Sequence, residues 1–453
     1  MIKRKSRTFM NSLTSKLYES LCEVPLIDIH THIDATHLSA RGIHDILLYH
    51  MVISDLYSAG CPDGSRMSES PDETEVAYRV ERAIPYLKYI QNTSCFWGVK
   101  TILKDLYGWD SEITTDNWRK LDSIIREKNK DNNWPRLILR KSGVKRIGTE
   151  LWRGHNHIAD DILQYSLEWA FFTRCQWGQF DTALLELEYA WNQEVPGAPL
   201  PVKIDRSKLN FKQTIKNLED VSKAICHYCE RIPYDNILSI ASHFSTDIEY
   251  RIVTNEEMIK ALANRDNAGP WERDVFANYI SEMFFNEIAR KKGNLTLQFS
   301  LGAEPLPFET GSKLRTETVF ELASLFERHK SLKFSLFISN LHQNQAACTL
   351  VRELPNVSLA GYWWHNFFPG SIRKVINERL DMIAANKQFG FFSDAYCVDW
   401  TYAKALIVRK QFAVVLSDKI EQGQYTFEQA LIIAKQILFE TAQETLGMKP
   451  VDF

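Results

Sequence analysis

Two histidines separated by one residue, His30 and His32, follow directly after the apolar run at residues 24–29. Alternate residues of a strand point to the same side, so both imidazoles can reach a single ion at the end of such a strand. Imidazole nitrogen is a preferred ligand for zinc and similar metals. We therefore predict that His30 and His32 bind a metal ion. The alternative is a pair of unconnected polar histidines in a loop.

Asp394 stands in a comparable place, at the end of the apolar run at residues 389–393. A carboxylate beside a dication can bind it and can also take up a proton from a substrate. The alternative is that Asp394 caps a following helix, a role that is equally open to Asp399. We predict that Asp394 is both a metal ligand and a catalytic residue.

Two further histidines have weaker patterns. His243 comes directly after the apolar run at residues 237–242. This position favours a catalytic role no more than a hydrogen bond to backbone. His50 lies on an apolar helical face, where spacing alone predicts a core histidine. Residues 361–370 are rich in aromatic side chains, and Trp363 and Trp364 could stack on a sugar ring or form a hydrophobic plug.

Eight short apolar runs alternate with helical patterns along the chain, which is typical of parallel strands covered by helices. We therefore predict an α/β fold, a TIM-type (β/α)8 barrel, with a helical insertion after the first strand. The helical patterns at residues 73–90, 96–106 and 117–128 lie in that insertion. Residues 1–35 and 141–453 would form the barrel and residues 36–140 the helical cap. The eight runs are residues 24–29, 144–149, 182–187, 237–242, 295–301, 332–338, 357–360 and 389–393.

Local signals mark the last helix of the chain. Thr426 and Gln429 form a capping-box pattern at its expected start. Gly447 predicts its end.

The composition of the 453-residue chain narrows the class of partner and compartment. A formal net charge of −3 argues against a basic field that recruits nucleic acid or an anionic membrane. The sequence has no apolar stretch of about 18 residues, the length that spans a bilayer. Its basic first residues are followed by a polar stretch, unlike a signal peptide. We expect a cytoplasmic protein with its eight cysteines reduced. A homo-oligomer is left open.

The order of these motifs resembles uronate (glucuronate) isomerase, a family of the amidohydrolase superfamily. His-Thr-His at residues 30–32 and Ser-Asp at 393–394 match its metal-binding strand ends. Ile-Ala-Ser-His at 240–243 looks like a Ser-Asp-His-Gly strand end, and Gln-Phe-Ser-Leu-Gly-Ala at 298–303 is similar to a Gln-Leu-His-Ile-Gly-Ala pattern. Residues 92–108 resemble the cap segment, and Gly-Tyr-Trp-Trp at 361–364 also fits.

The resemblance implies one divalent metal, with zinc as the expected ion, held by His30, His32 and Asp394. It implies the interconversion of an aldose and a ketose sugar acid of the glucuronate and fructuronate type. Asp394 would move the proton between C2 and C1 of this small-molecule substrate. The catalytic set would then also contain His50 and His243. The expected substrate contacts are Trp363, Trp364, Tyr396 and Arg153.

Four departures from the family pattern bear on the substrate. Tyr396 stands where the family has an arginine for the substrate carboxylate, and a phenol cannot supply a charged bidentate clamp. Met51 replaces a tyrosine and Ser300 replaces a histidine. The Thr-Thr-Asp-Asp-Pro signature is Gly-Thr-Glu-Leu-Trp at 148–152.

These departures leave an alternative open. It is a metal-dependent hydrolase of the same superfamily, acting on a lactone, ester or amide of a carbohydrate-like substrate, with the metal activating water. A non-catalytic protein that binds a carbohydrate or a partner is a third interpretation. In the isomerase interpretation, Arg153, Arg251 or Arg315 would replace the missing clamp.

Overall fold

The structure of the chain is a computed structural model. It describes residues 12–62, 73–150, 161–168, 184, 187–188, 191, 214–244, 250–292, 295–301, 317–339, 341–362 and 367–451.

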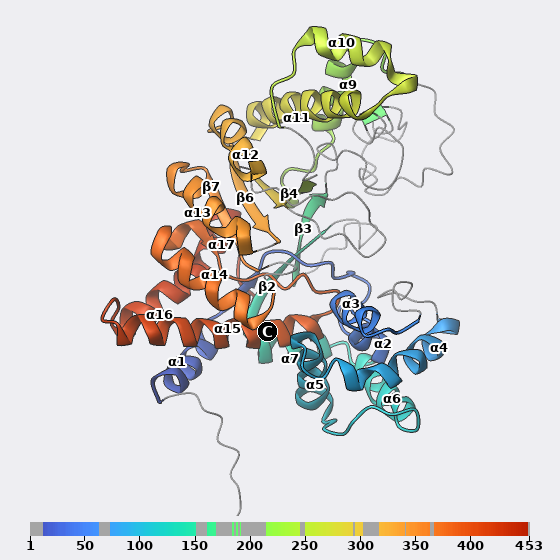
Figure 1. The fold of residues 1–453 in the computed structure, drawn as a ribbon, viewed down its shortest axis with the longest axis vertical. Coiled ribbons are helices and arrows are strands. Elements are labelled where there is room, and N and C mark those ends of the chain that lie inside the picture. The colour runs from blue at the N-terminus through green and yellow to red at the C-terminus, as the bar shows by residue number, and fades with distance from the viewer. Residues whose placement is uncertain are drawn as a thin grey trace, which may run out of the picture.

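Eight parallel strands form one curled sheet in the order of the sequence, from β1 to β8. With described helices in the connections from β1 to β2 and from β3 onward, this is the predicted TIM-type (β/α)8 fold (Figure 1). The strands are β1 (Leu26–Asp28), β2 (Val144–Glu150), β3 (Leu163–Glu168), β4 (Ile237–Phe244), β5 (Thr296–Leu301), β6 (Lys333–Ile338), β7 (Val357–Ala360) and β8 (Gln388–Phe389).

The described helices fall into three groups along the chain. Those up to β2 are α1 (Ser12–Glu23), α2 (Ile43–Leu47), α3 (His50–Ser58), α4 (Glu73–Ala83), η2 (Ile84–Tyr89), α5 (Ser94–Tyr107), α6 (Trp118–Asn129) and α7 (Trp134–Ser142). Those between β3 and β7 are α9 (Leu218–Glu230), α10 (Asn255–Ala263), η5 (Arg265–Asn267), α11 (Pro270–Lys292), α12 (Glu317–Arg328), η6 (Leu341–Gln343) and α13 (Asn344–Glu353). Those after β7 are α14 (Pro369–Met382), η8 (Ala385–Lys387), α15 (Val398–Glu421), α16 (Phe427–Lys435), η9 (Gln436–Glu440) and α17 (Thr441–Leu446).

The third strand is not where the sequence predicted it. Leu184 and Leu187, inside the run at residues 182–187, are helical and fully buried, because their spacing of three places them on one helical face. A short apolar run does not distinguish a buried strand from a buried helix. The third strand is β3, which has no continuous apolar run because polar residues alternate with its apolar ones. One of these polar residues, Ser166, has its Oγ 2.7 Å from Ser239 Oγ of β4.

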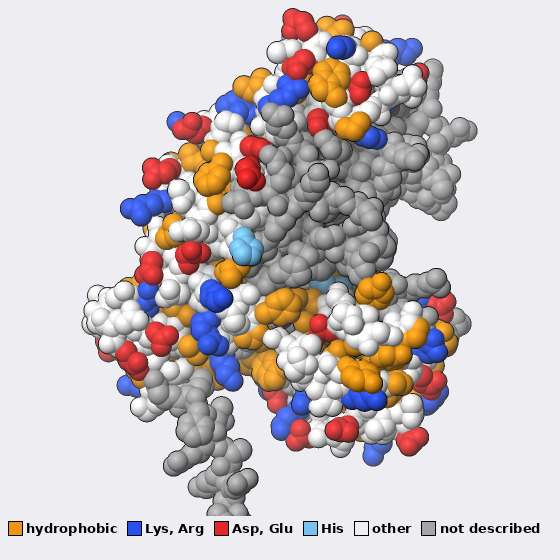
Figure 2. All heavy atoms as spheres, in the orientation of Figure 1, with side chains coloured by type: hydrophobic (Ala, Val, Ile, Leu, Met, Phe, Trp, Pro, Cys, Tyr) orange, Lys and Arg blue, Asp and Glu red, His pale blue; other side chains and the backbone are white. Residues whose placement is uncertain are grey.

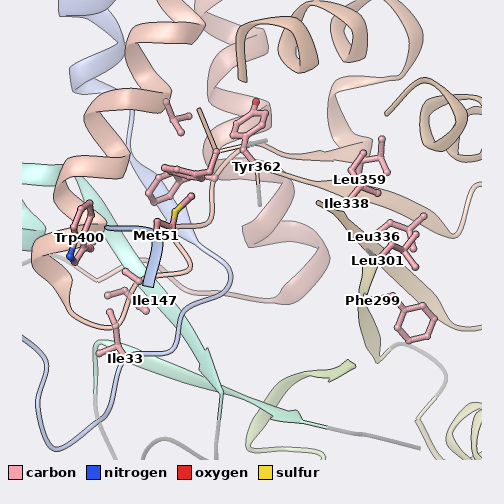
Figure 3. Close-up of a cluster of buried hydrophobic side chains, with 14 of the residues drawn as sticks. Ile33, Met51, Ile147, Phe299, Leu301, Leu336, Ile338, Leu359, Tyr362 and Trp400 are labelled. Carbon is pink, nitrogen blue, oxygen red and sulfur yellow. The ribbon is translucent and has the colours of Figure 1, made fainter. Parts of the chain in front are cut away.

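Alternate residues of the strands enter two separate apolar clusters, which explains why the runs are apolar throughout. The larger cluster joins the strands to the surrounding helices, and Figure 3 shows Leu301, Leu336, Ile338 and Leu359 of β5, β6 and β7 gathered within it. The smaller cluster contains Phe337 of β6. Its other strand-borne or strand-end members include Ile27, Ile29, Leu238, Phe389 and Phe392.

The seam between β8 and β1 is closed by segments that continue these short strands. Beyond the strand ends, the Asp394 N–H donates to the His30 carbonyl at 3.1 Å, and the His32 N–H donates to the Ala395 carbonyl at 2.8 Å. Nearer the start of the strands, the π-helical turn η9 contacts both β1 and β8, and the Gly390 N–H donates to the Ile437 carbonyl.

The helices α2 to α7 lie between β1 and β2 in the sequence and gather on one side of the molecule, away from α9, α10 and α11 (Figure 1). They occupy the range predicted as a helical insertion, and the domain limits at residues 36 and 140 stay a prediction. Residues of both charge signs occur across the described surface drawn in Figure 2. Within the described part of the chain, no helix is long and apolar enough to cross a membrane.

Gly148 allows β1 to approach β2 closely, because a Cβ at this position would lie 2.5 Å from the Ile29 carbonyl oxygen. We expect Gly148→Ala to lower the free energy of unfolding by about 1–3 kcal/mol, the usual cost of an overpacked core. The matched control is Gly370→Ala in α14, where a Cβ meets nothing within 4 Å. The measurement is urea denaturation of both variants, and equal stability would contradict the close approach.

Candidate metal centre

Three strand ends meet at one edge of the sheet and bring four polar side chains together. His30 and His32 follow β1, Glu150 is the last residue of β2, and Asp394 follows β8. Pairing between β1 and β2 continues past the end of β1, since the Glu150 N–H donates to the Thr31 carbonyl and Thr149 Oγ1 donates to the Ile33 carbonyl. This continued pairing places His32 and Glu150 side by side.

The two histidines and Asp394, which the sequence predicted to be metal ligands, lie with their polar atoms close together. Asp394 Oδ1 lies 3.5 Å from His30 Nε2 and 3.1 Å from His32 Nε2. In a tetrahedral zinc site with bonds of about 2.1 Å, neighbouring ligand atoms are about 3.4 Å apart. Since His30 and Asp394 are buried, with exposed fractions of 3% and 4%, the three ligand atoms form a preorganised edge of a small cation site.

Glu150 is a site residue that the sequence reasoning missed. Its Oε2 lies 2.9 Å from His32 Nδ1, and its Oε1 lies 3.8 Å from His30 Nε2. His30, His32 and Glu150 each offer a ligand atom, and these atoms all lie within 4.8 Å of one another. The sequence did contain a signal for Glu150, because this acid directly follows the predicted strand at residues 144–149. It lies in residues 148–152, which depart from the family signature.

Burial and charge act in opposite directions on the two groups that face each other. Burial alone would lower the pKa of His32, but the charge of Glu150 and the interactions with Asp394 raise this pKa to about 9. Burial would raise the pKa of Asp394, but hydrogen bonds from His30 and His32 and the charges of His32 and His50 hold it well below its ordinary value. The site therefore favours ionised Asp394 beside a positive charge.

The donor set fits a divalent cation. Two carboxylates and two imidazoles share a buried space, and buried negative charge is costly unless a cation compensates it. Nitrogen and carboxylate ligands in this combination are typical of catalytic zinc sites. His32 can bind an ion through Nε2 while its Nδ1–H donates to Glu150, the usual arrangement of a carboxylate behind a metal-bound histidine.

Asp394 adopts a left-handed backbone conformation with a φ of 53°, the one non-glycine residue with positive φ in the described part of the chain. This conformation is uncommon for residues other than glycine, and where it persists the surroundings hold it in place. Asp394 does not cap α15, whose N-cap is Cys397. Asp399 does not cap it either, because its carboxylate accepts hydrogen bonds from the Tyr107 hydroxyl and the Ala40 N–H.

His50 and Tyr396 lie beside this group of polar side chains. His50 Nε2 lies 3.8 Å from Asp394 Oδ2, whereas His30 and His32 are paired with Oδ1. Spacing alone predicted a core histidine here, and that interpretation is wrong, because the insertion places His50 at the strand ends. The ring of Tyr396 lies between two histidines, with centroids 5.1 Å from His32 and 5.4 Å from His50.

The remaining predicted site residues are only partly described. Trp363, Trp364, Arg153 and Arg315 lie outside the described residues. His243 belongs to β4, in register with Ser300 of β5, and its side chain is outside the described set. Arg251 forms an ion pair of 2.8 Å with Glu257 of α10.

Known structures with the same fold were found at low sequence identity. A uronate isomerase from Thermotoga maritima aligns over 96% of this chain and 98% of its own, with a TM-score of 0.76 and 12% identity. Glucuronate isomerase from Caulobacter crescentus aligns over 98% and 96%, with a TM-score of 0.76 and 13% identity. A protein from Lactobacillus casei ATCC 334, provisionally assigned as a metal-dependent hydrolase, aligns over 95% and 97%, with a TM-score of 0.60 and 14% identity.

The sequence itself matches no protein-family model and no curated protein. At these identities the likeness establishes architecture. Over nearly its whole length, this chain therefore shares the fold of the uronate isomerases.

Proposed function

We propose that this protein is a metal-dependent enzyme that interconverts the aldose and ketose forms of a sugar acid, in the manner of a uronate isomerase. The observation that carries the proposal is that the two carboxylate oxygens of Asp394 have different neighbours. Its Oδ1 faces the Nε2 atoms of His30 and His32, and its Oδ2 faces His50. One carboxylate can therefore help to hold a metal and still offer an oxygen as a base.

His30, His32 and Asp394 would hold the ion, and Glu150 would orient His32 by accepting its Nδ1–H. When bound, a divalent ion polarises a carbonyl and stabilises the oxyanion that develops beside it. Zinc is the ion we expect, because mixed imidazole and carboxylate ligation suits it.

Isomerisation needs a base that removes the proton from C2 of the aldose and returns it to C1 of the enediol. Asp394 Oδ2 would carry this proton, since the same oxygen can accept and release it. His50 lies beside Oδ2 and would exchange a proton with the substrate oxygens, which change between hydroxyl and carbonyl.

A second candidate is a metal-dependent hydrolase that acts on a lactone, ester or amide of a carbohydrate-like molecule. Tyr396 favours it, because the aromatic ring stands beside His32 where the isomerase resemblance expects a guanidinium. A substrate without an ionised carboxylate needs no such cation. In that reaction Asp394 Oδ2 would take a proton from water and deliver it to the leaving group.

The ligand assignment is tested by metal content. We expect the double variant His30→Ala, His32→Ala to lose bound zinc, since two of three ligands are removed, and Asp394→Asn to bind it far more weakly. Glu150→Gln should weaken zinc affinity by about 10- to 100-fold, the usual effect of losing a partner behind a metal-bound histidine. Inductively coupled plasma mass spectrometry and competition with a chelator measure these effects.

Glu282→Gln is the matched control, because Glu282 of α11 lies 3.1 Å from the Nε2 atom of His329, the residue after α12, in another carboxylate–histidine pair. It should keep full zinc affinity. Full zinc occupancy in the double histidine variant would rule out the assignment. Loss of zinc from Glu150→Gln as complete as from Asp394→Asn would make Glu150 a ligand.

The choice between the two reactions depends on Tyr396. We expect poor turnover of D-glucuronate, whose carboxylate stays ionised at neutral pH and needs a cation when buried. Tyr396→Arg should raise kcat/KM for D-glucuronate about 10- to 150-fold, because a charge-assisted hydrogen bond contributes roughly 1.5–3 kcal/mol. Steady-state assays on D-glucuronate measure this change.

Tyr396→Gln is the control, because it supplies a long polar side chain without charge and should give no such gain. Efficient turnover by the wild type would show that another cation already binds the carboxylate, with Arg153 the first to test. No gain from Tyr396→Arg, together with lactone or amide hydrolysis by the wild type, would select the hydrolase.

A further inference from the structure

The backbone of Ser393 and Asp394 is hydrogen-bonded at each of its polar groups. The Ser393 N–H donates to Asp28 Oδ1 at 2.9 Å, and the Asp394 N–H donates to the His30 carbonyl at 3.1 Å. The two carbonyls accept from side chains. Lys404 Nζ lies 2.5 Å from the Ser393 oxygen, and the Tyr49 hydroxyl lies 2.8 Å from the Asp394 oxygen.

Tyr49 and Lys404 reach this backbone from two distant parts of the chain. Tyr49 directly precedes α3 in the insertion, and Lys404 lies in α15. Lys404 Nζ is also 2.5 Å from the Tyr49 hydroxyl. An ammonium group can only donate, so the Tyr49 hydroxyl accepts from Lys404 and gives its own hydrogen to the Asp394 carbonyl. The two side chains therefore form a directed chain of hydrogen bonds that ends on Asp394.

Both side chains are enclosed on all sides. Tyr49 is fully buried, and Lys404 has an exposed fraction of 2%. The Tyr49 ring stacks on Trp400 at 4.4 Å, and Lys404 Nζ lies 4.3 Å from the centroid of the Phe367 ring. A buried ammonium group is costly unless it is hydrogen-bonded and charge-compensated. The hydrogen bonds that compensate this burial go to two backbone carbonyls, one of which belongs to Asp394.

We propose that Lys404 and Tyr49 are positioning residues that hold Asp394 in its left-handed conformation and so aim its carboxylate at His30 and His32. A left-handed non-glycine residue persists only where its neighbours restrain it. Lys404 restrains the Ser393 carbonyl before the strained φ, and Tyr49 restrains the Asp394 carbonyl after it. The assignment of Asp394 as a metal ligand rests on the proposed function. The restraint on its backbone does not.

The same device links the insertion to the strand ends. Tyr49 is the residue before His50, and the two rings pack at a centroid distance of 4.2 Å. Holding Tyr49 on the Asp394 carbonyl therefore also sets the place of His50 beside Asp394 Oδ2. The contact that packs the insertion against the strand ends is therefore also the contact that orients the Asp394 carboxylate.

The direct test is the backbone of Asp394 in crystal structures of Tyr49→Phe and Lys404→Met. We expect Asp394 to leave the left-handed region in both variants and its Oδ1 to move away from the histidines. The matched controls remove a buried hydroxyl and a buried ammonium from α15, the helix that carries Lys404. They are Tyr402→Phe, which loses a bond to Asp105, and Lys419→Met, which loses a bond to Asp381. Both should keep the wild-type conformation of Asp394.

The second test is the affinity for cobalt(II), whose absorption spectrum reports the ligand geometry. We expect Tyr49→Phe to weaken cobalt binding by about 10- to 100-fold, as for other residues that orient a metal ligand. Lys404→Arg keeps the charge and the donors and should recover part of the affinity lost in Lys404→Met. For a substrate that the wild type turns over, Tyr49→Phe should lower kcat more than it changes KM.

The outcomes separate this proposal from the proposed function. A wild-type protein without metal binding or isomerase activity would overturn the proposed function, and the φ of Asp394 in the variants would still decide the restraint. An unchanged φ and unchanged cobalt affinity in Tyr49→Phe would overturn the positioning role, even in an active isomerase. If Lys404→Met fails to fold, Tyr49→Phe alone tests the positioning role. This substitution removes a single oxygen atom and should leave the fold intact.

Discussion

The hydrogen bonds across the seam between β1 and β8 are the constraint on which the rest of the structure depends. β8 pairs through only two residues, so the sheet is closed by backbone that continues beyond both strands. A buried N–H must find an acceptor, and those of His32 and Asp394 find theirs on the opposite side of the seam. Closing the barrel therefore brings the residues of the candidate metal centre into contact.

Buried charge is the second constraint, and it follows from the first. The seam places Asp394 beside two imidazoles, the pairing of β1 with β2 adds Glu150, and Asp28 and Lys404 lie directly behind. Burial raises the pKa of Asp28 to about 7 and lowers that of Lys404 to about 8, although the charges of Asp394 and Asp28 act to raise the latter. Charges enclosed in this way stabilise one another only in a defined geometry, which favours a rigid site.

Two of the positions that differ from the uronate isomerase pattern, Tyr396 and Glu150, lie beside His32. His30, His32 and Asp394 lie together as the candidate ligands, whereas Tyr396 brings an aromatic ring where a cation was expected and Glu150 stands behind His32 in place of an aspartate of the signature. In the proposed function, such a distribution would keep the residues that hold the metal and change the side chains around them. Substrate choice is therefore the property most open to change on this fold.

The sequence by itself determined the features that depend on local periodicity. It placed seven of the eight strand regions, the helical insertion, the capping box at Thr426 and Gln429, and the helix end at Gly447. It also predicted that His30, His32 and Asp394 meet, and their side chains do lie together, because strand ends of a barrel share one edge. Their role as metal ligands stays a prediction. It misplaced the third strand, since apolar runs of six residues suit a buried helix as well.

Only the tertiary structure decided which side chains meet. Glu150 lies 118 residues from His32, and Lys404 lies 355 residues from Tyr49, so no local pattern links them. The spacing of His50 predicted a core residue, but the fold of the insertion places this side chain beside Asp394 at the strand ends. The left-handed conformation of Asp394 is likewise set by partners from β1, the insertion and α15. The spacing of apolar residues in the sequence indicates which face of a helix or strand is buried. Contacts between segments that are distant in the sequence arise only when the barrel closes.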